Sequence, residues 1–285
     1  RKVGLFLSGG TDSTILANEM SKSTSYKLDT FTYDFKNSGI YGEKNIAKKL
    51  ANKLGINNFS EIVEPKFVIN NFEKLIKIIE SPITSIRLFG VLKNYELAKK
   101  KNYKVIIEGH GGDEQFAGYN YNYIFYFLEK FKREKNKNSL INSLFFSNYF
   151  KKLNSEVLVN ILTTASFQNG STTDATPFIN LNFLNKEFLD KVIKEEYYFE
   201  KNFCKNLLKN SQMKDIKVLK LPRVLKYTDR ISMTNGIETR VPFLDHKFFE
   251  YGFNLKDNYK FNKGEARWIF KKVFRKKNIN YKNKR

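Results

Sequence analysis

The chain has 285 residues, 41% of them hydrophobic and 15% aromatic, so it can bury a sizeable core, and we do not expect disorder of the whole chain. Its net charge of +22 is spread along the sequence among many asparagine, phenylalanine and tyrosine residues, which favours a solvated surface over a nucleic-acid partner. One cysteine excludes an internal disulfide, and no apolar run approaches the roughly 20 residues that span a bilayer, so we expect a cytoplasmic protein without a membrane contact.

Strand-like and helix-like segments alternate through the first part of the chain. Short apolar or β-branched runs predict strands at 2–7, 28–35, 59–64 and 103–109. Helical spacing of apolar residues predicts helices at 12–23, 41–56, 65–80 and 88–101. This order is typical of an α/β fold, in which a parallel sheet carries helices on both faces and ligands bind at the carboxyl ends of the strands.

The pattern changes from about residue 121 onward. The later segments predict helices at 121–137, 139–153, 154–167 and 185–210. We therefore expect an α/β part at 1–130 and a mostly helical part at 131–285. Residue 1 is an arginine directly before a strand-like run, which indicates a piece of a longer protein.

The segment "SGGTDST" at 8–14 lies between the first predicted strand and the first predicted helix. Glycines let backbone N–H groups close around an anion, and the positive end of the helix points to the same place. Asp12 is unexpected at such a site unless a cation such as Mg²⁺ is held there too. The plainer alternative is a glycine turn in which Asp12 caps the helix. The segment is neither a Walker A loop nor GxGxxG, and it matches the SGGxDS pattern of PP-loop ATP pyrophosphatases.

A second loop, "EGHGGDEQFAGY" at 108–119, follows the fourth predicted strand. Gly111 and Gly112 would let the chain pass close to a ribose and phosphates, and Asp113 could be a second Mg²⁺ ligand facing Asp12. The alternative is that Asp113 and Glu114 only cap the next helix.

These motifs resemble one PP-loop family, the synthetase domain of glutamine-hydrolysing asparagine synthase. That family carries SGGxDSS, GxGGDExFxGY and DRxSMxxxxExRVPFLD in this order, and this chain has "SGGTDST", "GHGGDEQFAGY" and, at 229–245, "DRISMTNGIETRVPFLD". The resemblance covers nearly the whole chain and is weakest at about 120–215. It implies an adenine nucleotide alpha hydrolase-like α/β fold, with a nucleotide-binding part at 1–130.

The resemblance also implies a reaction and its cofactors, ATP and Mg²⁺. A substrate carboxylate attacks the α-phosphate of ATP to give an acyl-adenylate and pyrophosphate, and ammonia then displaces AMP to leave an amide such as asparagine. Phosphate charge has to be neutralised, which Mg²⁺ and a lysine can do, and the incoming amine needs a base.

The family's motif positions carry over to residues of this chain. The resemblance assigns the pyrophosphate loop to Ser8, Gly9, Gly10, Asp12 and Ser13. It assigns the metal to Asp12 and Asp113, and further nucleotide contacts to Gly109 and Gly111. Backbone contacts to adenine are implied for Leu5, Leu7 and Tyr33. The tail "YKNKR" looks like the family's RxKxGF, which makes Lys284 a candidate catalytic lysine; one more solvated lysine is the alternative.

His110 departs from the family. Asparagine-forming members usually have an acid there, and relatives that make other bonds, such as β-lactam synthetases, have tyrosine. Histidine titrates near neutral pH, so His110 could accept a proton from an amine or orient the substrate carboxylate. Alternatively, it only hydrogen-bonds the loop. His110 also puts aspartate in doubt as the substrate.

The expected partners are a small carboxylate substrate, ammonia or glutamine, and a second copy of the chain as one option. The family's glutaminase domain begins with a cysteine that this chain lacks, so we expect that domain upstream or on a separate chain.

Two alternatives stay open for the function. One is the same chemistry on a sugar uronate or another carboxylate, in surface-polysaccharide or peptide-product biosynthesis. The other is a PP-loop enzyme that modifies tRNA. The net charge of +22 favours this alternative, whereas the motifs at 109–119 and 229–245 do not.

Overall fold

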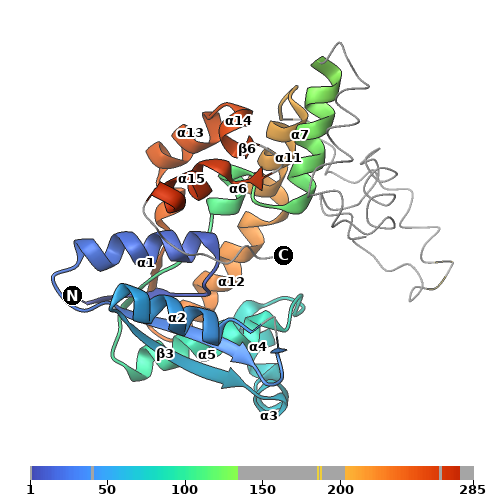
Figure 1. Cartoon of the computed structure of the whole chain (residues 1–285). Coiled ribbons are helices and arrows are strands. Elements are labelled where there is room, and N and C mark those ends of the chain that lie inside the picture. Colours follow the sequence, from blue (N-terminus) through green and yellow to red (C-terminus); the bar gives the residue numbers. More distant parts are fainter. Residues whose placement is uncertain are drawn as a thin grey trace. The chain divides into compact units, whose positions relative to one another are not determined.

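The computed structural model describes residues 2–39, 42–133, 185, 187, 203–262 and 265–276 (Figure 1). The chain divides into two compact units, each built from several stretches of sequence. The first unit comprises Arg1–Gly112, Arg223–Phe249 and Phe270–Arg285, and the second comprises Asp113–Pro222 and Glu250–Ile269. The boundary that the sequence predicts at residue 130 stays a prediction.

The described part of the first unit is built on a five-stranded parallel sheet. In chain order its strands are β1 (Val3–Phe6), β2 (Asp29–Phe35), β3 (Asn57–Val63), β4 (Val105–Ile107) and β5 (Glu238–Arg240). Their spatial order is β3-β2-β1-β4-β5, so the chain builds outward in both directions from β1. Open α/β sheets bind their ligands at such a switch point, outside the carboxyl ends of the strands.

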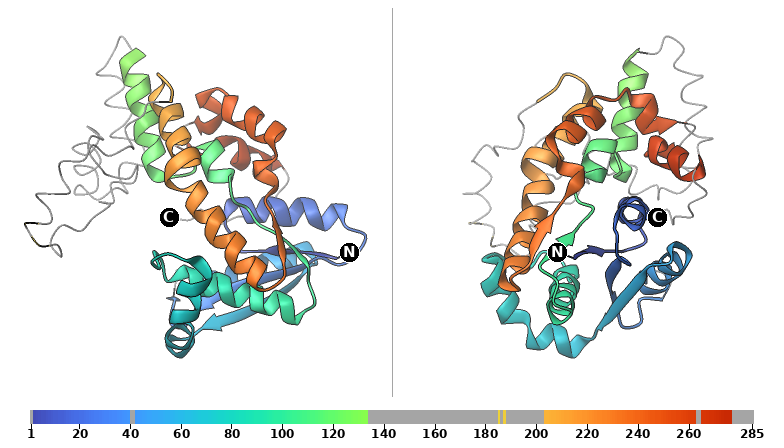
Figure 2. Two further views of the ribbon diagram at one scale, coloured as in Figure 1. Left: turned by 180° about the vertical axis from the view of Figure 1, so that it is seen from behind. Right: turned by 90° about the vertical axis from the view of Figure 1, so that its left-hand side faces the viewer.

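Helices cover both faces of this sheet, which confirms the predicted α/β fold. The helices that connect its strands are α1 (Thr11–Ser23), α2 (Lys44–Leu54), α3 (Pro65–Asn70), α4 (Phe72–Ile79) and α5 (Arg87–Lys100). The right-hand view of Figure 2 shows α1 and α2 on one side of the sheet and α5 on the other. The later helix α12 (Leu221–Thr234) packs on the α5 side through Tyr227 and Ile231.

The core of the first unit lies mainly between the sheet and α4, α5 and α12. Its fully buried members include Phe31 of β2, Leu75 and Ile79 of α4, Leu92 of α5 and Ile106 of β4. Side chains alternate across a strand, so Leu5 and Leu7 face the opposite side, and both are buried. Apolar burial on both faces fixes the register of the central strands.

The single helix predicted at 65–80 is wrong, because the segment forms two helices, α3 and α4, that meet at Asn71. The Asn71 side chain donates a hydrogen bond to the carbonyl of Phe67 at 2.9 Å, and its backbone leaves the helical region at φ −112° and ψ 7°. Asparagine side chains compete with the helix for backbone partners in this way.

The second unit is mostly helical where it is described, as the sequence predicts. Its elements include α6 (Gly112–Phe116), α7 (Asn120–Arg133), α11 (Leu207–Lys214), a π-helical turn (Asp215–Leu219), α14 (Asp257–Lys260) and the hairpin of β6 (Phe261–Asn262) and β7 (Glu265–Ala266). Helices α7 and α11 pack together around Tyr121, Phe125, Leu208 and Phe261. The helices predicted at 139–153 and 154–167, and most of 185–210, lie outside the described residues.

Two further helices, α13 (His246–Asn254) and α15 (Trp268–Lys276), follow the 3₁₀ turn Pro242–Leu244 in the sequence. Every helix in the part of the chain that the structure describes is too short or too polar to cross a lipid bilayer.

Candidate active site

The Ser8–Gly10 loop joins the central strand β1 to helix α1. Gly9 has φ +70°, and a Cβ atom at this position would lie 2.5 Å from the Ile46 side chain of α2. Both the backbone conformation and the lack of space therefore require glycine. Gly10 is the N-cap residue of α1, and Asp12 lies in the first turn of the helix.

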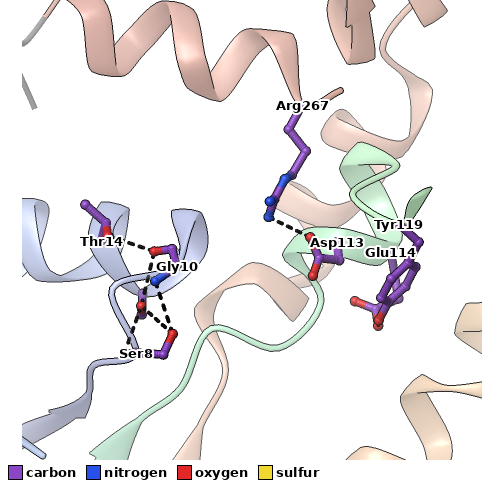
Figure 3. Close-up of polar contacts among 8 residues, drawn as sticks. Ser8, Gly10, Thr14, Asp113, Glu114, Tyr119 and Arg267 are labelled. Carbon is purple, nitrogen blue, oxygen red and sulfur yellow. Dashed lines mark hydrogen bonds and ion pairs between the residues drawn. The ribbon is translucent and has the colours of Figure 1, made fainter. Parts of the chain in front are cut away.

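Hydroxyl groups brace this loop against the start of α1 (Figure 3). The Ser8 hydroxyl accepts a hydrogen bond from the Gly10 N–H at 3.2 Å and lies 3.1 Å from the Ser13 hydroxyl. The Ser13 and Thr14 hydroxyls both donate to the Gly10 carbonyl, at 3.2 and 2.7 Å. The result is a fixed loop of small polar residues at the positive end of a 13-residue helix, which is the geometry of an anion site.

The loop after β4 lies against the same place, because β4 is a direct neighbour of β1. A Cβ atom at Gly112 would lie 2.9 Å from Oδ1 of Asp12, and one at Gly109 would lie 3.1 Å from the Asp12 Cβ. Glycine at these positions is what lets Asp12 fit between the two loops. Gly111 has φ +94° and packs beside Leu244 of the 3₁₀ turn. The loop after β1 and the loop after β4 therefore lie in contact within the first unit, as the sequence predicts.

His110 belongs to a chain of hydrogen-bonding side chains from four elements. Its Nε2 atom lies 2.5 Å from Oε2 of Glu108, a buried carboxylate, and 3.3 Å from the Thr228 hydroxyl of α12. The other oxygen of Glu108 accepts from the Tyr95 hydroxyl of α5 at 2.5 Å. The Tyr95 hydroxyl is in turn 2.5 Å from the hydroxyl of Thr239 on β5.

Tyr95 is the hydrogen-bond donor to Glu108 in this series of side-chain contacts. Burial first, and then the negative charge of Glu108, raises the pKa of the Tyr95 hydroxyl far above its usual value. A tyrosine hydroxyl has one proton to donate. With that proton directed at Glu108, the Thr239 hydroxyl donates to Tyr95.

In the second unit, Asp113 is paired with a cation that the sequence did not indicate. Nη1 of Arg267 lies 2.6 Å from Oδ1 of Asp113, and the Arg267 side chain is 12% exposed (Figure 3). Arg267 follows the β6–β7 hairpin with φ 53°, a left-handed conformation that costs a non-glycine residue about 1–2 kcal/mol. The neighbouring Glu114 accepts from the Tyr119 hydroxyl at 2.6 Å.

A buried lysine supports the helix that carries Asp113. The Gln212 side chain of α11 donates to the carbonyls of Glu114 and Gln115, at 2.7 and 2.9 Å. Its oxygen accepts from Nζ of Lys260 at 3.0 Å, and Lys260 also donates to the Phe253 carbonyl at 2.8 Å. Burial lowers the pKa of Lys260 to about 8.

The residues assigned to adenine lie in the central strands or directly after them. Leu5 pairs with Thr30 on one side and Ile107 on the other. The Leu7 N–H donates to Phe31 at 2.9 Å, and the Leu7 carbonyl accepts from the Thr32 hydroxyl at 2.6 Å. The ring of Tyr33 packs over Gly90 of α5, and burial raises the pKa of its hydroxyl. Their contact with adenine stays a prediction.

Within the described residues, no three acidic, histidine or cysteine side chains form a cluster that could hold a metal by themselves. Asp12 belongs to the first unit and Asp113 to the second, so their predicted pairing stays a prediction. Carboxylate oxygens are ligands that Mg²⁺ prefers, and two of them suit an ion that also binds phosphate oxygens. Lys284 lies outside the described residues.

Two arginines of the motif "DRISMTNGIETRVPFLD" form ion pairs. Arg240 pairs with Glu238 at 2.8 Å within β5, whereas Arg230 pairs with Glu80 at 2.5 Å. Glu80 stands outside the motif, in a left-handed conformation at the end of α4.

Sequence reasoning missed Glu108 and Tyr95 in the first unit and Arg267 in the second. Glu108 did carry a local signal, because alternate residues at the end of a strand face the same side and Glu108 is two residues before His110. Tyr95 and Arg267 carried none, since their contacts involve residues that are 13 and 154 positions away.

A parallel sheet with a Ser-Gly-Gly loop at its switch point, and without a Walker lysine, defines the class as a PP-loop α/β domain. The sequence pattern named asparagine synthase matches residues 1–284 of this chain. The chain therefore belongs to the asparagine synthase family, and it is the synthetase domain of that family.

Curated relatives match along most of the chain. It is 26% identical over 290 residues to asparagine synthetase (glutamine-hydrolyzing) 1 of Bacillus subtilis, covering 95% of this chain and 43% of the relative. It is 25% identical over 308 residues to amidase chyE of Penicillium rubens, with 90% and 43% covered. It is 24% identical over 282 residues to asparagine synthetase (glutamine-hydrolyzing) 3 of Bacillus subtilis, with 94% and 41% covered. The chain thus spans about two-fifths of the length of these relatives.

Proposed function

We propose that this chain is the synthetase part of an ATP-dependent amide-forming ligase. A carboxylate of the substrate attacks the α-phosphorus of ATP, an acyl-adenylate forms and pyrophosphate leaves. Ammonia then attacks the acyl carbon, AMP leaves and the amide remains. The observation that carries this proposal is the braced Ser8–Gly10 loop at the switch point of the sheet, with Asp12 fitted against the glycines of the second loop.

The Ser8–Gly10 loop holds the pyrophosphate portion of ATP. The N–H groups at the start of α1 and the Ser8 hydroxyl would donate to it, while the Ser13 hydroxyl holds the loop through the Gly10 carbonyl. Hydrogen-bond donors that are fixed before the reaction stabilise the charge that develops on the leaving pyrophosphate. Gly109 and Gly111 keep side chains away from the path of the nucleotide.

Asp12 and Asp113 would hold Mg²⁺ in this proposal. Asp113 directly follows Gly112, the residue against which the Asp12 carboxylate packs. When bound, the ion neutralises phosphate charge and so makes pyrophosphate a better leaving group. Arg267 holds the Asp113 carboxylate in one orientation through Oδ1.

His110 handles a proton in the second half-reaction. An amine that has attacked a carbonyl carbon must lose a proton before a stable amide is left, and an imidazole side chain can accept that proton. Orientation of the substrate carboxylate is the alternative role. Lys284 is proposed to neutralise the adenylate, as the motif resemblance implies.

The nitrogen source is glutamine, through a glutaminase domain upstream or on a separate chain. Two of the relatives are named glutamine-hydrolyzing, and this chain spans about two-fifths of their length.

A second candidate keeps the chemistry and changes the acceptor to a sugar uronate or another carboxylate. Two observations favour it. His110 stands where asparagine-forming members usually have an acid, and one of the matched relatives is named an amidase.

The test is ATP–pyrophosphate exchange with Mg²⁺, catalysed by the full-length protein, with aspartate compared against a panel of uronates and amino-acid carboxylates. We expect exchange that depends on one of these carboxylates. Exchange with aspartate identifies an asparagine synthase, and exchange only with another carboxylate identifies the second candidate. No exchange with any of them contradicts the proposal.

A matched pair of glycine variants shows whether the Ser8–Gly10 loop carries this activity. Gly9→Ala and Gly55→Ala both place alanine at a positive φ, which costs each about 1 kcal/mol or more. A Cβ meets Ile46 only at Gly9, because nothing lies within 4 Å of the Gly55 position. We expect Gly9→Ala to abolish exchange and Gly55→Ala to retain it. Equal activity of the two variants would contradict the assignment.

A further inference from the structure

The contacts of Glu108 point to a role that its sequence motif does not assign. Glu108 directly follows β4, and its side chain is only 8% exposed. Burying a carboxylate costs free energy unless both of its oxygens have hydrogen-bond partners. Each carboxylate oxygen of Glu108 has its own partner. Oε1 accepts a hydrogen bond from the Tyr95 hydroxyl, and Oε2 lies 2.5 Å from Nε2 of His110. The Glu108 N–H donates to the carbonyl of Arg240 on β5 at 2.9 Å, which fixes its backbone as well.

We propose that Glu108 is a positioning residue for His110. Its carboxylate accepts the Nε2–H of the imidazole, and this hydrogen bond fixes both the ring orientation and the tautomer. In a neutral imidazole only one nitrogen carries the proton, so Nδ1 is then the basic nitrogen. This inference rests on the role of His110 in the proposed function.

Residues of two other elements hold the Glu108 side chain in place. Tyr95 of α5 donates to Oε1 of Glu108, and Thr239 of β5 holds Tyr95. A helix and an edge strand therefore hold the carboxylate, and the carboxylate holds the imidazole. A general base that is oriented by a third group needs no reorganisation when the amine arrives.

Thr228 is the competing acceptor for the same proton, because its hydroxyl is 3.3 Å from Nε2. The distance favours Glu108, as does its charge, since hydrogen bonds to ionised acceptors are shorter and about twice as strong. The two candidates can be separated by removing each acceptor in turn.

The test is proton and ¹⁵N NMR of the ligand-free protein labelled at histidine. This chain has two histidines, His110 and His246, and the His110 signals are those that disappear in His110→Gln. We expect a far-downfield, slowly exchanging proton on Nε2 of His110. It should be lost in Glu108→Met, which removes the acceptor at similar length, and kept in Glu108→Gln and in Thr228→Val.

Loss of this proton in Thr228→Val, or its persistence in Glu108→Met, would overturn the inference. This measurement needs neither nucleotide nor acceptor, so it decides the Glu108–His110 contact even if the proposed amide chemistry fails. Thermal melting of each variant checks that it is folded.

Kinetics of the full-length protein test what the contact does. Glu108→Met should lower kcat for amide formation by about 100-fold, the scale of general base catalysis, with the KM for ATP unchanged. Glu108→Gln should recover part of the loss. A wild-type kcat in Glu108→Met would overturn the positioning role, whereas absence of activity in the unaltered protein would count against the proposed function alone.

Discussion

At the residue scale, Asp113 has two roles that one substitution removes together. It is the candidate second metal ligand, and its Oδ1 atom is also 2.6 Å from Nη1 of the largely buried Arg267. A loss of activity after substitution at Asp113 therefore reports either a lost ligand or a disturbed ion pair. The sequence predicted the first role, and only the structure brings Arg267 to the same carboxylate.

A double-variant cycle separates the two roles. Asp113→Asn removes the counter-charge of Arg267 and should lower the free energy of unfolding by about 1–2 kcal/mol. Adding Arg267→Gln also removes the cation of this ion pair and should restore part of this stability, measured by urea unfolding. If Asp113 holds the metal, ATP–pyrophosphate exchange of the full-length protein stays lost in the double variant. Recovery of exchange together with stability would show a structural role only.

At the scale of elements, short and charged segments are where the sequence predicted least. Strand β5 has three residues, Glu238, Thr239 and Arg240, and none is fully buried. It carries no apolar alternation, yet it completes the edge of the sheet beside β4 and supplies Thr239 to the Tyr95 hydroxyl. Charged residues are common on edge strands, because they discourage pairing with other chains. The break between α3 and α4 at Asn71 is also absent from the apolar pattern, because helical spacing of apolar residues continues across it.

Lys260 of α14 makes the stability of the second unit depend on pH. Its pKa is about 8 in the folded chain, against an ordinary value of 10.5, because it is fully buried. Between these values the unfolded chain holds more protons, so stability rises with pH by up to about 1.4 kcal/mol per pH unit. Above about pH 10 the buried tyrosines oppose this trend, since burial raises their pKa values.

Urea unfolding at pH 8, 9 and 10 measures this dependence. Lys260→Met should remove the rise in stability, and Lys256→Met should keep it, because Lys256 lies exposed on the same segment. The same rise in all three proteins would contradict the assignment to Lys260. Since Lys260 supports α6 through Gln212, Lys260→Met also tests how strongly α14 and α11 fix the segment that carries Asp113.

At the scale of the whole molecule, the net charge of +22 is the property that most favours a nucleic-acid partner. We expect only non-specific binding, because the basic residues are spread along the sequence. RNA binding by the full-length protein should fall steeply as salt is raised from about 50 to 200 mM, equally for tRNA and for an unrelated RNA of the same length. A preference for tRNA that persists at the higher salt would favour the tRNA-modifying alternative.

The sequence by itself determined the family, the alternating α/β order and the two loops, because each depends on residues close together in the chain. "SGGTDST" and "GHGGDEQFAGY" specify glycines, hydroxyls and acids whose spacing alone sets a strand–loop–helix geometry. The tertiary structure decided which distant side chains meet these loops. Strand order places the β4 loop beside the β1 loop, α5 and β5 bring Tyr95 and Thr239 to Glu108, and the β6–β7 hairpin leads to Arg267 at Asp113. Such contacts have no local pattern, because they arise only when packing of apolar faces brings remote segments together.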